Sequence, residues 1–131
     1  MSVVRQPSRP DLEAFHLSMT MPFRFVVKQL IDQLGAKLVA YIGGVSEVRA
    51  AKEWADDRVP KDPTVERKLR FALRVTLLII ERDSRAVAQA WFQGLNPQLG
   101  DRVPAQLLRD GDIEEVGPEV VAAARAFVVG G

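Results

Sequence analysis

The sequence predicts an all-α protein, a helical bundle of six to eight helices. Apolar residues recur at helical spacing: Val27, Leu30, Ile31 and Leu34 fall at positions i, i+3, i+4 and i+7 of one stripe. Alternation with a period of two, the pattern of a half-buried strand, is nowhere sustained. Proline and glycine divide the chain into short helical segments, which favours a bundle over a few long helices.

The composition limits the class of protein. The 131 residues make one domain, or two small helical modules that share a core. The net charge is +1, so affinity for nucleic acid or membrane would have to come from local patches. Cysteine is absent, which excludes disulfides, thiolate nucleophiles and zinc–thiolate sites. The longest apolar run, Val75 to Ile80, is far shorter than the ~20 residues of a membrane span, so we expect a cytoplasmic protein without membrane contact.

Residues 1–20 are predicted to form a mobile N-terminal arm. Pro7, Ser8 and Pro10 interrupt this segment, and no apolar period is sustained in it. A short turn of helix around residues 12–17 is the most regular structure that we expect there.

Residues 21–60 are predicted to contain a helix-turn-helix-like unit. The expected helices cover residues 22–34, 36–42 and 46–54. Gly43 and Gly44 form the turn between the last two, Ala40 is the small residue where these helices cross, and Ser46 is the N-cap. The side chains expected to point inward from the third helix are Val48, Ala51 and Trp54.

This unit is a candidate for DNA binding. Its third helix would present exposed positions to the major groove. The candidate DNA contacts are Lys37, Ser46, Arg49, Lys52 and Arg58. Four carboxylates lie on or beside the same surface, those of Glu47, Glu53, Asp56 and Asp57. Phosphate contacts need uncompensated positive charge, so two alternatives stay open: a unit that binds DNA as part of a dimer, and a unit used only for packing.

Residues 61–131 are predicted to form a second helical module. Its longest helix is expected over 63–82, started by Asp62 and Pro63 and mostly buried in its second half. The later helices are expected to start at Asp83 or Ser84, at Asn96, at Pro104 and at Pro118. The long helix also carries the best local cationic patch, Arg67, Lys68, Arg70 and Arg74. This patch is countered nearby only by Glu66, and it is equally compatible with a DNA or acidic partner and with a solvated face.

Within this module, residues 90–111 read AWFQGLNPQLGDRVPAQLLRDG and resemble the toxin-binding domain of Xre/MbcA/ParS-type antitoxins. That domain has a Trp followed by an apolar residue, an Asn-Pro-x-Leu element, a small-residue turn, a Pro, and a Leu-Leu pair closed by a Gly. The matching residues here are Trp91, Phe92, Asn96, Pro97, Leu99, Gly100, Pro104, Leu107, Leu108 and Gly111. The similarity covers roughly residues 62–129, and Asp101 stands where the family often has a second small residue.

The resemblance implies a type II antitoxin that binds and blocks a RES-domain toxin, an enzyme that consumes NAD. It further implies a homodimer that binds its own promoter DNA through the helix-turn-helix. The side chains expected to contact the toxin are the exposed ones around the motif, Gln93, Asn96, Arg102 and Arg109. The alternatives are a toxin-free helix-turn-helix regulator or nucleoid-associated DNA-binding protein, and a structural adaptor that self-assembles.

The residue types do not favour an enzyme. His16 is the sole histidine, so a catalytic triad or a histidine metal site would have to be built on it, and we expect it at the surface. The acidic residues in 110–115 lack the spacing of an EF-hand and suit the first turn of a helix. No carboxylate pair has an evident reason for split pKa values. We therefore predict a binding protein without cofactor, metal or small-molecule substrate.

Overall fold

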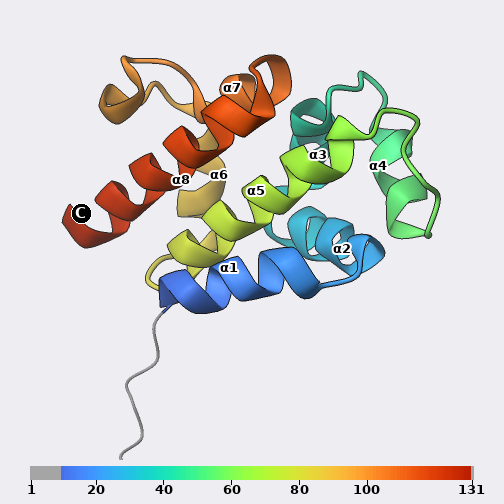
Figure 1. Ribbon diagram of the computed structural model, residues 1–131, viewed down its shortest axis with the longest axis horizontal. Coiled ribbons are helices and arrows are strands. Elements are labelled where there is room, and N and C mark those ends of the chain that lie inside the picture. Colours follow the sequence, from blue (N-terminus) through green and yellow to red (C-terminus); the bar gives the residue numbers. More distant parts are fainter. Residues whose placement is uncertain (1–9, 131) are drawn as a thin grey trace, which may run out of the picture.

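The computed structural model describes residues 10–130, and within them the chain is all-helical, as predicted (Figure 1). The elements are α1 (Pro10–Thr20), α2 (Phe23–Leu34), α3 (Ala36–Gly43), α4 (Val48–Ala55), α5 (Thr64–Ile80), α6 (Arg85–Gln93), the 3-10 helix η1 (Pro97–Leu99), α7 (Pro104–Asp110) and α8 (Ile113–Gly130). Among these residues the one β-type pairing is an isolated antiparallel bridge between Asn96 and Arg102.

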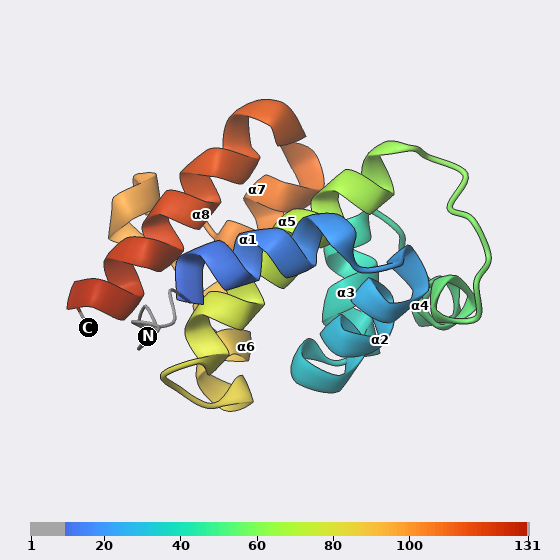
Figure 2. The ribbon, with the colours of Figure 1, turned by 60° about the horizontal axis from the view of Figure 1, so that its bottom comes forward.

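Helix α5 is the centre of the bundle. Figures 1 and 2 show it running through the molecule with α1 on one side and α8 on another. It packs against α1, α2, α3, α6, α7 and α8. Apolar residues on all sides of its second half make this possible, and its buried hydroxyl at Thr76 donates to the carbonyl of Ala72 at 2.8 Å. The predicted central rod over 63–82 is thus confirmed, with slightly shorter bounds.

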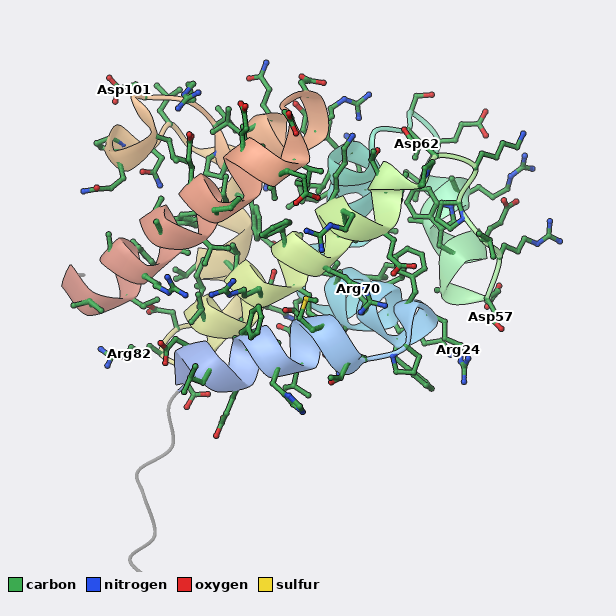
Figure 3. The ribbon with its side chains drawn as sticks, in the orientation of Figure 1. Arg24, Asp57, Asp62, Arg70, Arg82 and Asp101 are labelled. Atoms are coloured by element: carbon green, nitrogen blue, oxygen red, sulfur yellow. The ribbon has the colours of Figure 1, made fainter. Side chains whose placement is uncertain are left out.

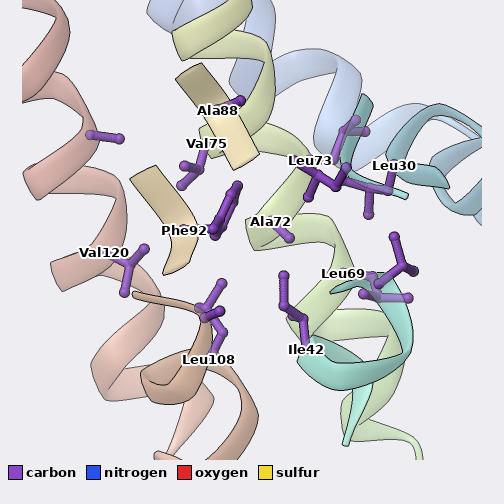
Figure 4. Packing of buried hydrophobic residues seen from close by; sticks show 14 of the residues in the cluster. Leu30, Ile42, Leu69, Ala72, Leu73, Val75, Ala88, Phe92, Leu108 and Val120 are labelled. Carbon is purple, nitrogen blue, oxygen red and sulfur yellow. The ribbon is translucent and has the colours of Figure 1, made fainter. Parts of the chain in front are cut away.

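The buried side chains form one core that runs across the predicted boundary between residues 60 and 61. Figure 4 shows Phe92 of α6 between α5, α7 and α8, with Leu108 and Val120 beside it. The same cluster continues through Leu69 of α5 to Leu30 of α2. The helix-turn-helix-like part and the C-terminal part therefore share a single core.

The predicted mobile arm is wrong for residues 10–20, which form α1. Ala14 and Ser18, one turn apart, are buried, and these small side chains let α1 approach α5 closely. Arg70 of α5 donates to the carbonyls of Ser18 and Met21 at 3.0 and 2.8 Å, which satisfies the end of α1 (Figure 3). These partners are 49 and 52 residues away, so no local pattern indicates them. The rest of the predicted arm, residues 1–9, lies outside the described residues.

The predicted start of the last helix at Pro118 is also wrong. Helix α8 begins at Ile113 and contains Pro118, and the Asp112 carboxylate caps it by accepting the N–H of Glu114 at 3.1 Å. Gly117 explains why the proline is tolerated, because a residue before proline without a Cβ avoids the clash that would push it out of the helical region. A Cβ at position 117 would lie 2.7 Å from the ring of Phe71, so glycine also leaves the room that this ring needs.

Candidate functional site

The predicted helix-turn-helix is built from α3, the turn at residues 44–47 and α4, which together with α2 occupy one end of the molecule (Figure 1). Gly44 has φ = 91°, and its N–H and that of Val45 bond to the carbonyls of Tyr41 and Ala40. This is the hydrogen-bond pattern of a Schellman motif, in which glycine takes the left-handed position. The turn predicted at the two glycines is thus formed by Gly44, whereas Gly43 ends α3 beneath the ring of Trp54.

Two predictions for this unit are wrong. Ser46 does not cap the next helix: α4 begins at Val48, its N-cap is Glu47, and no side-chain cap hydrogen bond is present there. Val48 is more than one-third exposed, although Ala51 and Trp54 are buried as predicted. The Schellman turn is the physical reason, because Val45 packs against the core and Glu47 is still extended before the helix can start.

The five predicted DNA contacts do not form one cationic surface. Arg49 and Lys52 share the exposed side of α4, but Arg49 is paired with Glu53 at 3.5 Å and with Glu47 at 3.9 Å. Over residues 36–58, four cations and four carboxylates give 4 − 4 = 0. The cations are Lys37, Arg49, Lys52 and Arg58, and the carboxylates are Glu47, Glu53, Asp56 and Asp57. Ser46 is exposed beside them, and the unit as a whole offers phosphates no net charge.

Lys37 and Arg58 lie in grooves of their own. Lys37 lines a groove of about 410 Å³ between α3 and the α6–α7 region, where it meets Gln93, a predicted toxin contact. Arg58 lines a separate groove of about 460 Å³ with Trp54 and Lys68. The structure thus places Lys37, a predicted DNA contact, in one groove with Gln93, a predicted toxin contact, whereas Arg58 shares its groove with Glu53 and Trp54 of α4.

The motif segment from Asn96 to Arg102 is a closed loop. Asn96 is buried, and its side chain accepts the N–H of Gln98 at 2.9 Å while its backbone N–H donates to Arg102 at 3.0 Å. Gly100 and Asp101 both have positive φ, 66° and 61°. This left-handed pair explains why a small residue suits position 101, an exposed site labelled in Figure 3.

Two of the predicted toxin contacts also bond within the fold: Asn96 is buried, although it was expected at the surface, and Arg109 is half-buried. Asn96 closes the loop just described. Arg109 donates to the carbonyl of Tyr41 at 2.6 Å and stacks on its ring at 4.7 Å, which links α7 to the end of α3. Lys68 adds to this link by donating to the carbonyl of Arg109 at 2.8 Å. A local sequence motif cannot indicate such contacts between elements that are far apart in sequence.

The other two predicted contacts are exposed. Gln93 is at the surface at the end of α6, and Arg102 is exposed although it forms an ion pair with Glu119 at 3.5 Å. A groove that sequence reasoning missed is lined by a third predicted contact, Asn96. It has about 500 Å³ and an apolar wall formed by Trp91, Leu95, Ala123, Ala126 and Phe127. Leu95 is 72% exposed. In the sequence it stands between Gly94 and Asn96, and an apolar residue at such a turn was the available sign of a surface groove.

The basic run of the long helix is largely neutralised. Arg67 donates to both carboxylate oxygens of Glu114 at 3.0 Å, and Arg70 pairs with Glu66 at the same distance. Arg74 has no hydrogen bond or ion pair with any described residue, and its buried Nε lacks an acceptor. Burial, and then the nearby charge of Arg125, lowers the pKa of Arg74 from its ordinary value. Glu114 of α8 was the partner missed, because it lies 47 residues from Arg67.

The Arg67–Glu114 pair predicts a small acid dependence of stability. Hydrogen bonding to Arg67 lowers the pKa of Glu114, so its stabilisation is present above the unfolded pKa and is lost as pH falls through the folded pKa. We expect Glu114→Gln to lose less stability than the wild type between neutral pH and about pH 3 in urea unfolding. Both side chains are substantially exposed, so the difference should shrink at high salt. Glu115→Gln is the matched control, and an equal pH profile for the two variants would contradict the pairing.

Other kinds of site have little support among residues 10–130. His16 is exposed on α1. The described part of the chain contains no group of three or more histidines or carboxylates able to hold a metal ion, and none of its helices is long and apolar enough to cross a membrane. Comparisons of the chain with protein-family models, curated proteins and solved structures find no match. Function therefore has to be inferred from the surfaces just described and from the motif in residues 90–111.

Proposed function

We propose that the chain is a protein-binding antitoxin whose C-terminal part binds and blocks a RES-type, NAD-consuming toxin. The observation that carries the proposal is the apolar groove beside the closed loop of residues 96–102. The groove borders the segment that resembles the antitoxin domain, and Leu95 and Ala126 are exposed in it. Leu95 is 72% exposed at a groove whose wall is apolar, and contiguous exposed apolar surface marks interaction sites.

The arrangement supports binding more than catalysis. The loop is held by hydrogen bonds from Asn96 and by the buried Leu99, so its shape is set before a partner arrives. A preformed loop loses little conformational entropy on binding. The groove wall is apolar, with the tilted Trp91 and Phe127 rings 6.4 Å apart, and aromatic side chains are enriched in protein interfaces.

The test is inhibition of the RES-domain toxin encoded in the same operon. Excess wild-type chain should suppress NAD loss by the purified toxin. Leu95→Asp combined with Ala126→Asp should weaken the inhibition roughly tenfold or more, because carboxylates would replace apolar contacts in the groove. Val59→Asp, at a side chain that is 88% exposed outside this groove, is the control and should inhibit like the wild type. A toxin left fully active by excess wild-type chain would refute the proposal.

DNA binding through α4 is a second candidate, favoured by the exposed Arg49 and Lys52 on a helix at the end of the molecule. The ion pair between Arg49 and Glu53 predicts how DNA binding can be strengthened. Glu53→Gln should remove this ion pair from Arg49 and so raise the affinity for DNA. Arg49→Ala with Lys52→Ala should abolish binding. Gel retardation at low and high salt measures both effects. If Glu53→Gln and the double alanine variant retard DNA equally, α4 does not contact the phosphates.

A further inference from the structure

Helix α1 has an outer side that is unusually apolar for a surface helix. Leu12, Phe15 and Met19 are between 45% and 52% exposed, while the buried positions of the same helix are the small Ala14 and Ser18. A helix that is apolar on several sides is normally buried on all of them. The side of α1 with small residues packs against α5, and no described element covers the large side chains on its outer side.

Two of these exposed side chains border a groove between α1, α5 and α8. The groove has about 310 Å³; its apolar walls include Phe15, Met19 and Phe71, and its charged residues are Arg67, Arg70, Arg74 and Glu114. Glu66, which is outside the lining, pairs with one of these arginines, Arg70. Figure 1 shows α5 between α1 and α8, and α5 contributes Phe71 and the three arginines to the lining.

Among residues 10–130, Arg74 is the lining arginine that has no ion pair. Arg67 and Arg70 are occupied by Glu114 and Glu66, whereas Arg74 only stacks on the ring of Phe15, with its guanidinium carbon 4.8 Å from the ring centre. Arg125 of α8 is close enough for its charge to oppose that of Arg74. Asp11 favours the charged form of Arg74, but to a smaller extent than Arg125 opposes it. A cation held on an aromatic ring beside a second cation is well placed to bind a carboxylate.

We propose that this surface, the α1–α8 groove with the outer side of α1, binds an acidic amphipathic helix of a partner protein. One carboxylate of that helix pairs with Arg74, and the exposed Arg125 of α8 adds positive charge that attracts it. Its apolar residues, spaced at i, i+3 or i+4 and i+7, cover Leu12, Phe15 and Met19. The partner is a polypeptide and not a small anion, because the apolar strip continues along α1 past the groove to Leu12.

The charge pattern selects this occupant over the chain's own N-terminal segment. The nine residues before α1 contain two arginines and no carboxylate, so they do not complement a groove whose unpaired charge is the cation of Arg74. The inference goes beyond the antitoxin proposal, since it concerns a different face and does not require a RES toxin. The groove at Leu95 and the α1–α8 groove share no lining residue.

The test is selection of helical peptides from a displayed random library on the immobilised full chain. Peptides that bind should combine Asp or Glu with apolar residues at helical spacing. Their affinity, measured by fluorescence anisotropy, should fall about tenfold on Arg74→Gln and on Arg125→Gln, and should weaken with salt. Met19→Ser should also weaken it, whereas Arg49→Gln on α4 should have no effect. Arg125 and Met19 are exposed, so their variants test the surface even if Arg74→Gln impairs folding.

Three outcomes would overturn the inference. The first is a selection that gives no binding peptides, or peptides without acidic residues. The second is binding that Arg74→Gln and Arg125→Gln leave unchanged, including peptides whose binding is lost on Leu95→Asp instead. The third is a dimer in light scattering that Met19→Ser dissociates, since this would identify a second copy of the chain as the occupant.

Discussion

Phe92→Ala is expected to destabilise the protein by about 3–5 kcal/mol, because it removes a fully buried aromatic ring from the centre of the core. The ring lies where α5, α6, α7 and α8 meet (Figure 4), so no single helix can move in to fill the cavity. Urea unfolding followed by circular dichroism measures the loss. Fluorescence of Trp91, whose ring centroid is 5.6 Å from that of Phe92, should report the change locally.

The matched control is Phe25→Ala on α2. Phe25 is 41% exposed and lies under the cations of Arg24 and Lys28, so its loss should cost roughly 1 kcal/mol or less. Because one core spans both halves of the chain, Phe92→Ala should lower the midpoint of a single transition instead of unfolding only the C-terminal half. Equal effects of the two phenylalanine variants would contradict this core.

Trp54→Ala is expected to have the second large effect, about 3–5 kcal/mol, because the buried indole fixes α4 on α3. Gly43 is the complementary feature. A Cβ at this position would lie 2.8 and 2.9 Å from the far edge of the indole, closer than real contacts allow. Gly43→Ala should therefore cost about 1–3 kcal/mol by overpacking, although alanine is the better helix former.

A double-mutant cycle separates this clash from a general helix effect. Phenylalanine lacks the outer ring atoms of the indole, so Gly43→Ala should be much less harmful in a Trp54→Phe background. Gly130→Ala, where no atom lies within 4 Å, is the control for the helix propensity alone. Purely additive costs for Gly43→Ala and Trp54→Phe would show that the ring does not set the requirement for glycine.

Local patterns predicted most of the helices. Ser84 caps α6 by accepting the N–H of Val87, and Asn96 caps η1, both as expected. These features depend on residues within one turn of each other, which a single sequence displays directly. The failures at α1 and at Pro118 have different origins. The end of α1 depends on a distant partner, Arg70. The start of α8 is set by a local cap at Asp112, and the proline five residues inside the helix is a misleading start signal.

The candidate sites were less predictable than the helices. Motif reasoning correctly placed Gln93 and Arg102 at the surface, whereas Asn96 is buried and Arg109 is half-buried with a hydrogen bond to Tyr41. A motif residue with a strong local or structural role looks the same in sequence as one that contacts a partner. The groove around Leu95 forms where α6 lies beside α8, and the cationic groove at Arg74 forms where α1 lies beside α5. Residues close in sequence do not indicate either arrangement.

The amino-acid sequence by itself determined the all-helical class, the positions of most helix ends and the chemistry available at the surface. It did so because propensity, capping and apolar period act within a few residues. Only the tertiary structure decided which charges remain uncompensated. Glu114 neutralises Arg67 across the bundle while Arg74 is left beside Arg125, since the electrostatic energy of a side chain depends on distances in space and not along the chain.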